Sequence, residues 1–179
     1  MMKRGMLCLF LVLSLLCLCL SAQAETTADG EFEYTLRADG TVQIEKYLGS
    51  AEKVTVPEEV AGAPVVYIGA GAFQGNTALK NLVLPERLWV IGASAFAGCE
   101  SLTTVTVHYG LIEIQEGAFA QCGSLAYLRL PETISKIGET AFADCPNVSP
   151  TVMPYSYPDE YCEAHGIIPI YLSCADCWN

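Results

Sequence analysis

Apolar residues recur along this chain at a fixed spacing of 23 residues. The dipeptide Ala-Phe occurs four times at this interval, and an isoleucine stands five residues before each phenylalanine. The residues at these positions are Ile68, Phe73, Ile91, Phe96, Ile114, Phe119, Ile137 and Phe142. A constant period with apolar residues in register is the signature of a solenoid, whose repeats bury their apolar faces against each other. We expect these eight side chains to form the structural core of the repeats.

Each repeat also contains a short segment in which apolar and polar residues alternate. An example is Leu82-Val83-Leu84, which is followed by Pro85. This alternation, ended by proline, predicts a short strand with one buried face. Because successive repeats run in the same direction, equivalent strands are expected to pair in parallel, about 4.8 Å apart. The Ile-Gly steps predict tight turns, and the Ala-Phe segments predict one or two helical turns on the opposite side.

The segments that flank the repeats predict caps, which a solenoid needs to cover its terminal repeats. Residues 32–44 hold two alternating segments around Asp39-Gly40, a pattern typical of a β-hairpin. The first repeat carries an insertion of about five residues around Gly62. After the last repeat we expect a weak strand, a short helix and a closing strand, at residues 151–153, 158–166 and 168–172.

The first 24 residues have the anatomy of a secretory signal. Lys3 and Arg4 precede an apolar run over residues 6–20, and Ala22-Gln23-Ala24 has the small-x-small pattern of a cleavage site. We expect cleavage after Ala24 and a secreted or cell-surface-associated protein, with a retained signal anchor as the alternative. No other long apolar stretch follows, so no membrane span is expected after cleavage.

These patterns divide the chain into five segments. They are a signal peptide (1–24), an N-terminal hairpin cap with the first strand (25–57), leucine-rich repeats of period 23 (58–148), a C-terminal cap (149–173) and a cysteine-containing tail (174–179).

The repeat resembles a known family. Residues 91–108 read Ile-Gly-Ala-Ser-Ala-Phe-Ala-Gly-Cys-Glu-Ser-Leu-Thr-Thr-Val-Thr-Val-His. This is similar to the pattern I-G-x-x-A-F-x-x-C-x-x-L-x-x-V-x-L-P of the BspA-like (Treponema pallidum type) leucine-rich repeats of bacterial surface proteins, and departs from it at its end. The resemblance covers residues 32–172.

The family resemblance and the periodicity together predict the fold and suggest a role. The fold class is an α/β-type repeat solenoid: a right-handed leucine-rich-repeat coil with a parallel β-sheet on one face and short helical turns on the other. A β-hairpin caps its N-terminus, and a helix and a strand cap its C-terminus. The resemblance implies adhesion to host matrix proteins, other microbes or glycans.

Composition and motifs argue against two other classes of protein. The formal net charge is −11, whereas neutralising nucleic-acid phosphates requires a basic face. Only His108 and His165 are available as histidine bases, and the sequence contains no G-x-S-x-G, H-E-x-x-H or phosphate-loop motif. We therefore expect neither an enzyme nor a bound cofactor.

Three cysteines, Cys99, Cys122 and Cys145, share one repeat position with Asn76. We expect them to form a structural ladder of buried free thiols, the alternative being a redox or metal column. A second set follows near the C-terminus with the spacing C-x2-H-x8-C-x2-C, and its members are Cys162, His165, Cys174 and Cys177. A disulfide among these three cysteines, unpaired thiols and a zinc site are the three interpretations of this set.

The outward strand positions offer a surface for recognition. We expect the binding residues to be Thr55, Asn81, Val83, Thr104, Thr106, His108, Tyr109, Tyr127 and Arg129. Solenoids commonly bind partners on such a face, and Tyr and Arg are frequent interface anchors. The predicted function is that of an exported protein that binds a protein or glycan ligand. The alternatives are a structural spacer or assembly module without a ligand, and a metal or redox role of the C-terminal cysteines.

Overall fold

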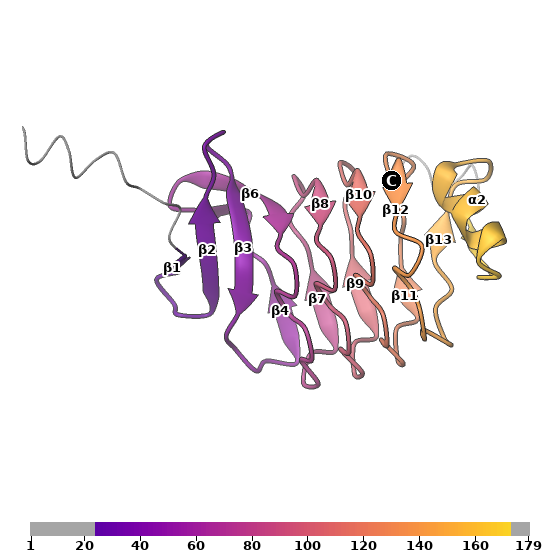
Figure 1. The fold of residues 1–179 in the computed structure, drawn as a ribbon, viewed down its shortest axis with the longest axis horizontal. Coiled ribbons are helices and arrows are strands. Elements are labelled where there is room, and N and C mark those ends of the chain that lie inside the picture. Colours follow the sequence, from indigo (N-terminus) through magenta and orange to yellow (C-terminus); the bar gives the residue numbers. More distant parts are fainter. Residues whose placement is uncertain (1–23, 173–179) are drawn as a thin grey trace, which may run out of the picture.

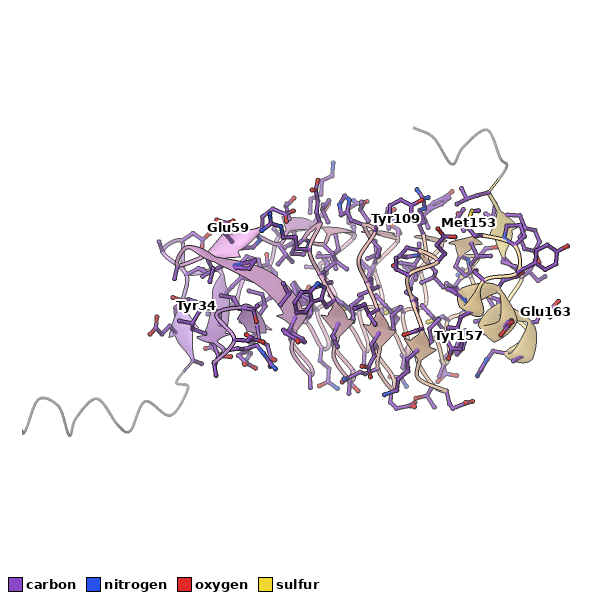
Figure 2. The ribbon with its side chains drawn as sticks, turned by 90° about the horizontal axis from the view of Figure 1, so that it is seen from above. Tyr34, Glu59, Tyr109, Met153, Tyr157 and Glu163 are labelled. Carbon is purple, nitrogen blue, oxygen red and sulfur yellow. The ribbon has the colours of Figure 1, made fainter. Side chains whose placement is uncertain are left out.

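The computed structural model describes residues 24–172, which form an elongated solenoid (Figure 1). Tyr34 lies near one end and Glu163 near the other (Figure 2). A four-stranded parallel sheet, in the order β11-β9-β7-β4, consists of β4 (Lys53–Thr55), β7 (Asn81–Val83), β9 (Thr104–Thr106) and β11 (Tyr127–Leu128). An eight-stranded sheet runs beside it in the order β1-β2-β3-β6-β8-β10-β12, with β5 paired to β6. Its strands are β1 (Glu25–Thr26), β2 (Phe32–Leu36), β3 (Val42–Tyr47), β5 (Glu59–Val60), β6 (Ala63–Ile68), β8 (Val90–Ile91), β10 (Glu113–Ile114) and β12 (Lys136–Ile137).

The parallel strands predicted from the alternating segments are confirmed. Leu82 pairs with Val105, and Val105 pairs with Leu128, so the register advances by one 23-residue repeat per strand. These three side chains are buried, and their neighbours along each strand face outward because successive strand residues point to opposite faces. One side of the four-stranded sheet therefore lines the core and the other side is open.

The Ile-Gly steps form a second parallel sheet and not the tight turns that we predicted. Ile91 ends β8 and pairs with Ile68 on one side and Ile114 on the other. Gly92 does not have a left-handed φ. A Cβ atom at Gly92 would lie 2.7 Å from the carbonyl oxygen of Ile68. Glycine is required here because the backbones of adjacent repeats approach each other closely.

The Ala-Phe segments are successive β-turns, where we predicted short helical turns. The N–H groups of Ala95 and Ala97 donate to carbonyls three residues earlier. Ser94, at φ 54°, and Gly98, at φ 72°, have left-handed backbones that interrupt a helix. The Phe96 N–H instead donates to the Ala118 carbonyl of the next repeat at 2.8 Å. Hydrogen bonds between repeats therefore run along this wall as well.

The phenylalanines form one stack along the solenoid axis. The centroid distances are 5.0 Å for Phe73–Phe96, 5.1 Å for Phe96–Phe119 and 5.5 Å for Phe119–Phe142. All eight repeat-core side chains, Ile68, Phe73, Ile91, Phe96, Ile114, Phe119, Ile137 and Phe142, are buried. We expected Phe142 to meet only Thr151 beyond it, but Tyr161 of the cap helix packs edge-on against its ring at 6.2 Å.

Both ends of the repeat array are covered. Strands β2 and β3 pair antiparallel next to β6, and the inserted segment forms the hairpin β5–β6, whose turn residues Ala61 and Gly62 have positive φ. The other end holds β13 (Thr151–Val152), α2 (Tyr157–Ala164) and β14 (Ile170–Tyr171), with β13 and β14 parallel. Over residues 24–172, no helix has the length and apolar character needed to cross a membrane. The predicted signal peptide lies almost wholly outside these residues.

Candidate binding face of the four-stranded sheet

The open side of the four-stranded sheet carries most of the predicted binding residues. We call this surface the strand face, formed by Lys53, Thr55, Asn81, Val83, Thr104, Thr106, Tyr127 and Arg129. Register aligns Lys53, Asn81, Thr104 and Tyr127 in one row, and Thr55, Val83 and Thr106 in a second. Arg129 continues the second row and bridges to Thr151 of the C-terminal cap. Lys53 was not among the predicted residues.

A cluster of large side chains lies at the C-terminal end of the strand face. Tyr127 is 68% exposed and Tyr109 is 54% exposed. The Arg129 guanidinium lies 4.8 Å from the centroid of the Tyr109 ring and donates a hydrogen bond to the Tyr109 hydroxyl. A cation over an aromatic face is electrostatically attracted to it. This contact fixes two interface-type side chains before any partner arrives, which lowers the entropy that binding must cost.

Tyr109 belongs to the turn that leaves β9, at the rim of the strand face (Figure 2). In the repeats on either side, the positions of His108 and Tyr109 are held by Pro85-Glu86 and by a second Pro-Glu pair. The two predicted rim residues thus replace a proline and an acidic residue in one repeat only. His108 is half-buried and Tyr109 is exposed. The substitution places an aromatic ring between two acidic positions of the rim.

The remainder of the strand face is small and polar. Thr55 and Thr106 are exposed, whereas Asn81, Val83 and Thr104 are half-buried. At one edge Lys80 forms an ion pair with Glu52 at 2.9 Å, and the hydrogen bond from Lys80 lowers the pKa of this carboxyl. Within residues 24–172, no three His, Cys, Asp or Glu side chains come together as metal ligands. The face can offer hydrogen bonds, aromatic contacts and one guanidinium to a partner.

The cysteine ladder lies inside the solenoid. Cys99, Cys122 and Cys145 are buried and free. Their thiols donate hydrogen bonds to the carbonyls of Phe73, Phe96 and Phe119 in the preceding repeats, at 3.2, 3.1 and 2.9 Å. Asn76, at the same repeat position, instead accepts hydrogen bonds from two backbone N–H groups of its own turn. The thiols therefore connect successive repeats, which supports the structural interpretation of the ladder.

Burial should make the Cys99 thiol unreactive in the native protein. Burial raises its pKa from 9.0 to about 11, so near neutral pH its thiolate fraction is about 100-fold below that of an exposed thiol. We expect alkylation of Cys99 to be at least 100-fold slower in the native state than in urea, measured per residue by mass spectrometry. Equal rates in the two states would show that the ladder opens to solvent.

The second cysteine set is only partly described, because Cys174 and Cys177 lie outside residues 24–172. The Cys162 thiol is fully buried in α2, and burial raises its pKa to about 11. The two ring nitrogens of His165 lie 2.8 Å from the Tyr161 carbonyl and 3.2 Å from a carboxylate oxygen of Glu139. His165 thus connects the cap helix to the last repeat. Its ring already has two partners, and a disulfide of Cys162 stays a prediction.

Sequence reasoning missed a group of apolar side chains on the eight-stranded sheet. Tyr67, Trp89, Val90 and Ile112 lie there, and Trp89 and Ile112 are exposed. Trp89 and Ile112 share one repeat position, directly before β8 and β10. This signal was present in the sequence. It went unrecognised because the following Ile-Gly steps were interpreted as turns and not as strands of a second sheet.

The constant period, the parallel sheets and the phenylalanine stack define a leucine-rich-repeat solenoid. Residues 48–159 match the BspA type leucine rich repeat region, in six copies. The chain belongs to this family, as the resemblance predicted. The family indicates a protein-interaction role, because its members are generally binding or scaffold proteins and not enzymes.

Solved structures of bacterial proteins share this fold. The T. pallidum leucine-rich-repeat protein TpLRR is 31% identical over 72% of this chain and 71% of its own, with a TM-score of 0.60. A leucine-rich-repeat protein from Bacteroides capillosus is 27% identical over 68% of this chain and 94% of its own, also at 0.60. A leucine-rich cell surface protein from Faecalibacterium prausnitzii, 23% identical over 76% of this chain and 46% of its own, has a TM-score of 0.59 and shows the fold alone. No curated protein matches the chain.

Proposed function

We propose that this chain is an exported protein that acts at or near a cell surface and binds another protein through the strand face. The observation that carries the proposal is the cluster of Tyr127, Arg129 and Tyr109, which is exposed, preformed and placed at one end of an open parallel sheet. Interface energy concentrates in a few such Tyr and Arg side chains. The threonines beside them provide polar contacts around this anchor.

Two further observations support the cellular setting of the proposal. The first 24 residues have the pattern of a secretory signal, and the Faecalibacterium relative is described as a cell surface protein. An exported binding protein of this family fits a role in adhesion. The partner would be a host or microbial protein, and a glycan attached to that protein is the alternative ligand.

Replacing Tyr127 and Arg129 together by serine should abolish partner binding and leave the fold intact. Loss of two anchor residues typically weakens an interface by about 2 kcal/mol or more, roughly 30-fold or more in Kd. The measurement is capture of partners from host and microbial protein extracts by the wild type and by the variant. Tyr155→Ser is the matched control, because Tyr155 is 97% exposed on the C-terminal cap, away from the strand face. Equal capture by the double variant and the wild type would leave the spacer interpretation.

A further inference from the structure

The eight-stranded sheet presents a second surface that the proposed function does not use. We call it the aromatic patch, formed by Tyr67, Trp89, Val90 and Ile112. Trp89 is 41% exposed and Ile112 is 47% exposed. The Tyr67 and Trp89 rings pack edge to face, with centroids 6.1 Å apart. The Arg37 guanidinium lies 4.1 Å from the centroid of the Tyr67 ring. Arg, Tyr and Trp, the residue types most enriched in interface anchors, are therefore fixed together on one face.

The polar groups around the aromatic patch are already satisfied within the chain. Arg37 donates to the Gln43 amide oxygen at 2.9 Å, and the Gln43 amide donates to Glu45 at 3.1 Å. Lys136 donates to Glu113 at 2.8 Å. A sugar needs free donors and acceptors beside an aromatic ring, whereas a protein surface can cover groups that are paired already at a lower desolvation cost. The patch therefore fits a protein partner better than a glycan.

The charges around the patch are arranged so that the face complements itself. Register places Gln43, Tyr67, Val90, Glu113 and Lys136 in one row across β3, β6, β8, β10 and β12. A two-fold axis along β8, lying between two facing copies, reverses the order of the strands. Strand β6 then faces β10 of the second copy, and β3 faces β12. A symmetric interface of this kind needs one patch that matches itself.

This operation brings opposite charges together at both ends of the patch. Arg37, held over Tyr67 of β6, comes opposite Glu113 of β10. Glu45 of β3 comes opposite Lys136 of β12, and Trp89 meets the Trp89 ring of the other copy. We propose that two copies of this chain associate through the aromatic patch, face to face and with their solenoid axes reversed. The partner that fits this surface is a second copy of the chain.

The size of the patch predicts a weak, reversible dimer. Five strands about 4.8 Å apart and only a few residues wide bury roughly 500 Å² per copy, at the low end for specific interfaces. The net charge of −11 opposes association, and added salt should weaken this repulsion. The strand faces lie on the other sheet, so a dimer would present two of them and could bind a multivalent surface more tightly than one copy.

The test is sedimentation equilibrium of the chain after signal removal, from low to high micromolar concentration. We expect a reversible dimer whose Kd rises about tenfold or more in Trp89→Ser. Tyr127→Ser, on the strand face, should dimerise like the wild type, and thermal unfolding checks that each variant is folded. A wild type that keeps the mass of one copy at every concentration, or a Trp89→Ser variant that dimerises equally well, would overturn the proposal.

A charge exchange tests the geometry independently of the tryptophan. Arg37→Glu and Glu113→Arg should each weaken self-association, because each places like charges opposite one another at both symmetric contacts. A mixture of the two variants should associate more strongly than either alone, since the hetero-pair has opposite charges at both contacts. Rescue in the mixture supports the two-fold arrangement along β8, and failure of the mixture to associate contradicts it.

Discussion

Replacing Phe119 by alanine is expected to lower the free energy of unfolding by about 3–5 kcal/mol. The Phe119 side chain is fully buried, and its ring stacks on Phe96 at 5.1 Å and on Phe142 at 5.5 Å. A solenoid couples mainly nearest neighbours, so the cavity would weaken two interfaces between repeats. Urea unfolding followed by circular dichroism measures the loss.

The matched variant is Phe142→Ala, which should cost less by about 1 kcal/mol. Phe142 is slightly exposed, and its outer neighbour is Tyr161, which contacts it edge-on at 6.2 Å and not in a parallel stack. A larger loss at Phe142 than at Phe119 would show that stability is concentrated in the C-terminal cap and not in the repeats.

Replacing Gly92 by alanine should destabilise the fold by about 1–3 kcal/mol although it adds a single methyl group. The new Cβ atom would lie 2.7 Å from the Ile68 carbonyl oxygen and 2.8 Å from the Ala70 nitrogen. These are backbone atoms of the preceding repeat, so the two repeats would have to move apart. Chemical denaturation measures the change.

The control for Gly92 is Gly123→Ala, because a Cβ atom at Gly123 would have no neighbour within 4 Å and this glycine does not have a left-handed φ. We expect its stability to stay within about 0.5 kcal/mol of the wild type. If Gly92→Ala were as stable as Gly123→Ala, close approach of the repeats would not be the reason for glycine after isoleucine.

The sequence predicted the repeat core because burial repeats with the period. Ile91 and Phe96 recur at fixed spacing, and a side chain stacked on its own equivalent must be apolar in every repeat. The two local predictions that failed concern backbone conformation. Gly92 could not be assigned to close packing without the neighbouring repeat, and Ser94 takes a left-handed φ that its residue type does not announce.

The candidate site was predictable to a similar extent. Tyr127 and Arg129 could be assigned to the open face because they alternate with buried leucines. The contact between Arg129 and Tyr109 could not, because it joins a strand to the turn of the preceding repeat, 20 residues away. The role of Tyr161 was also hidden, since this residue continues the phenylalanine stack from a helix outside the repeat period.

The most direct test of protein recognition by the strand face is site-specific photo-crosslinking. A photoreactive residue at Thr106, exposed near the centre of the face, is compared with one at Gln74, exposed on the β-turn side of the solenoid. Each protein is irradiated in host and microbial protein extracts, and the adducts are identified by mass spectrometry. We predict discrete protein adducts from Thr106 that disappear with Tyr127→Ser and Arg129→Ser, and none from Gln74. The same adducts from both positions, or adducts from Gln74 alone, would contradict recognition by the strand face.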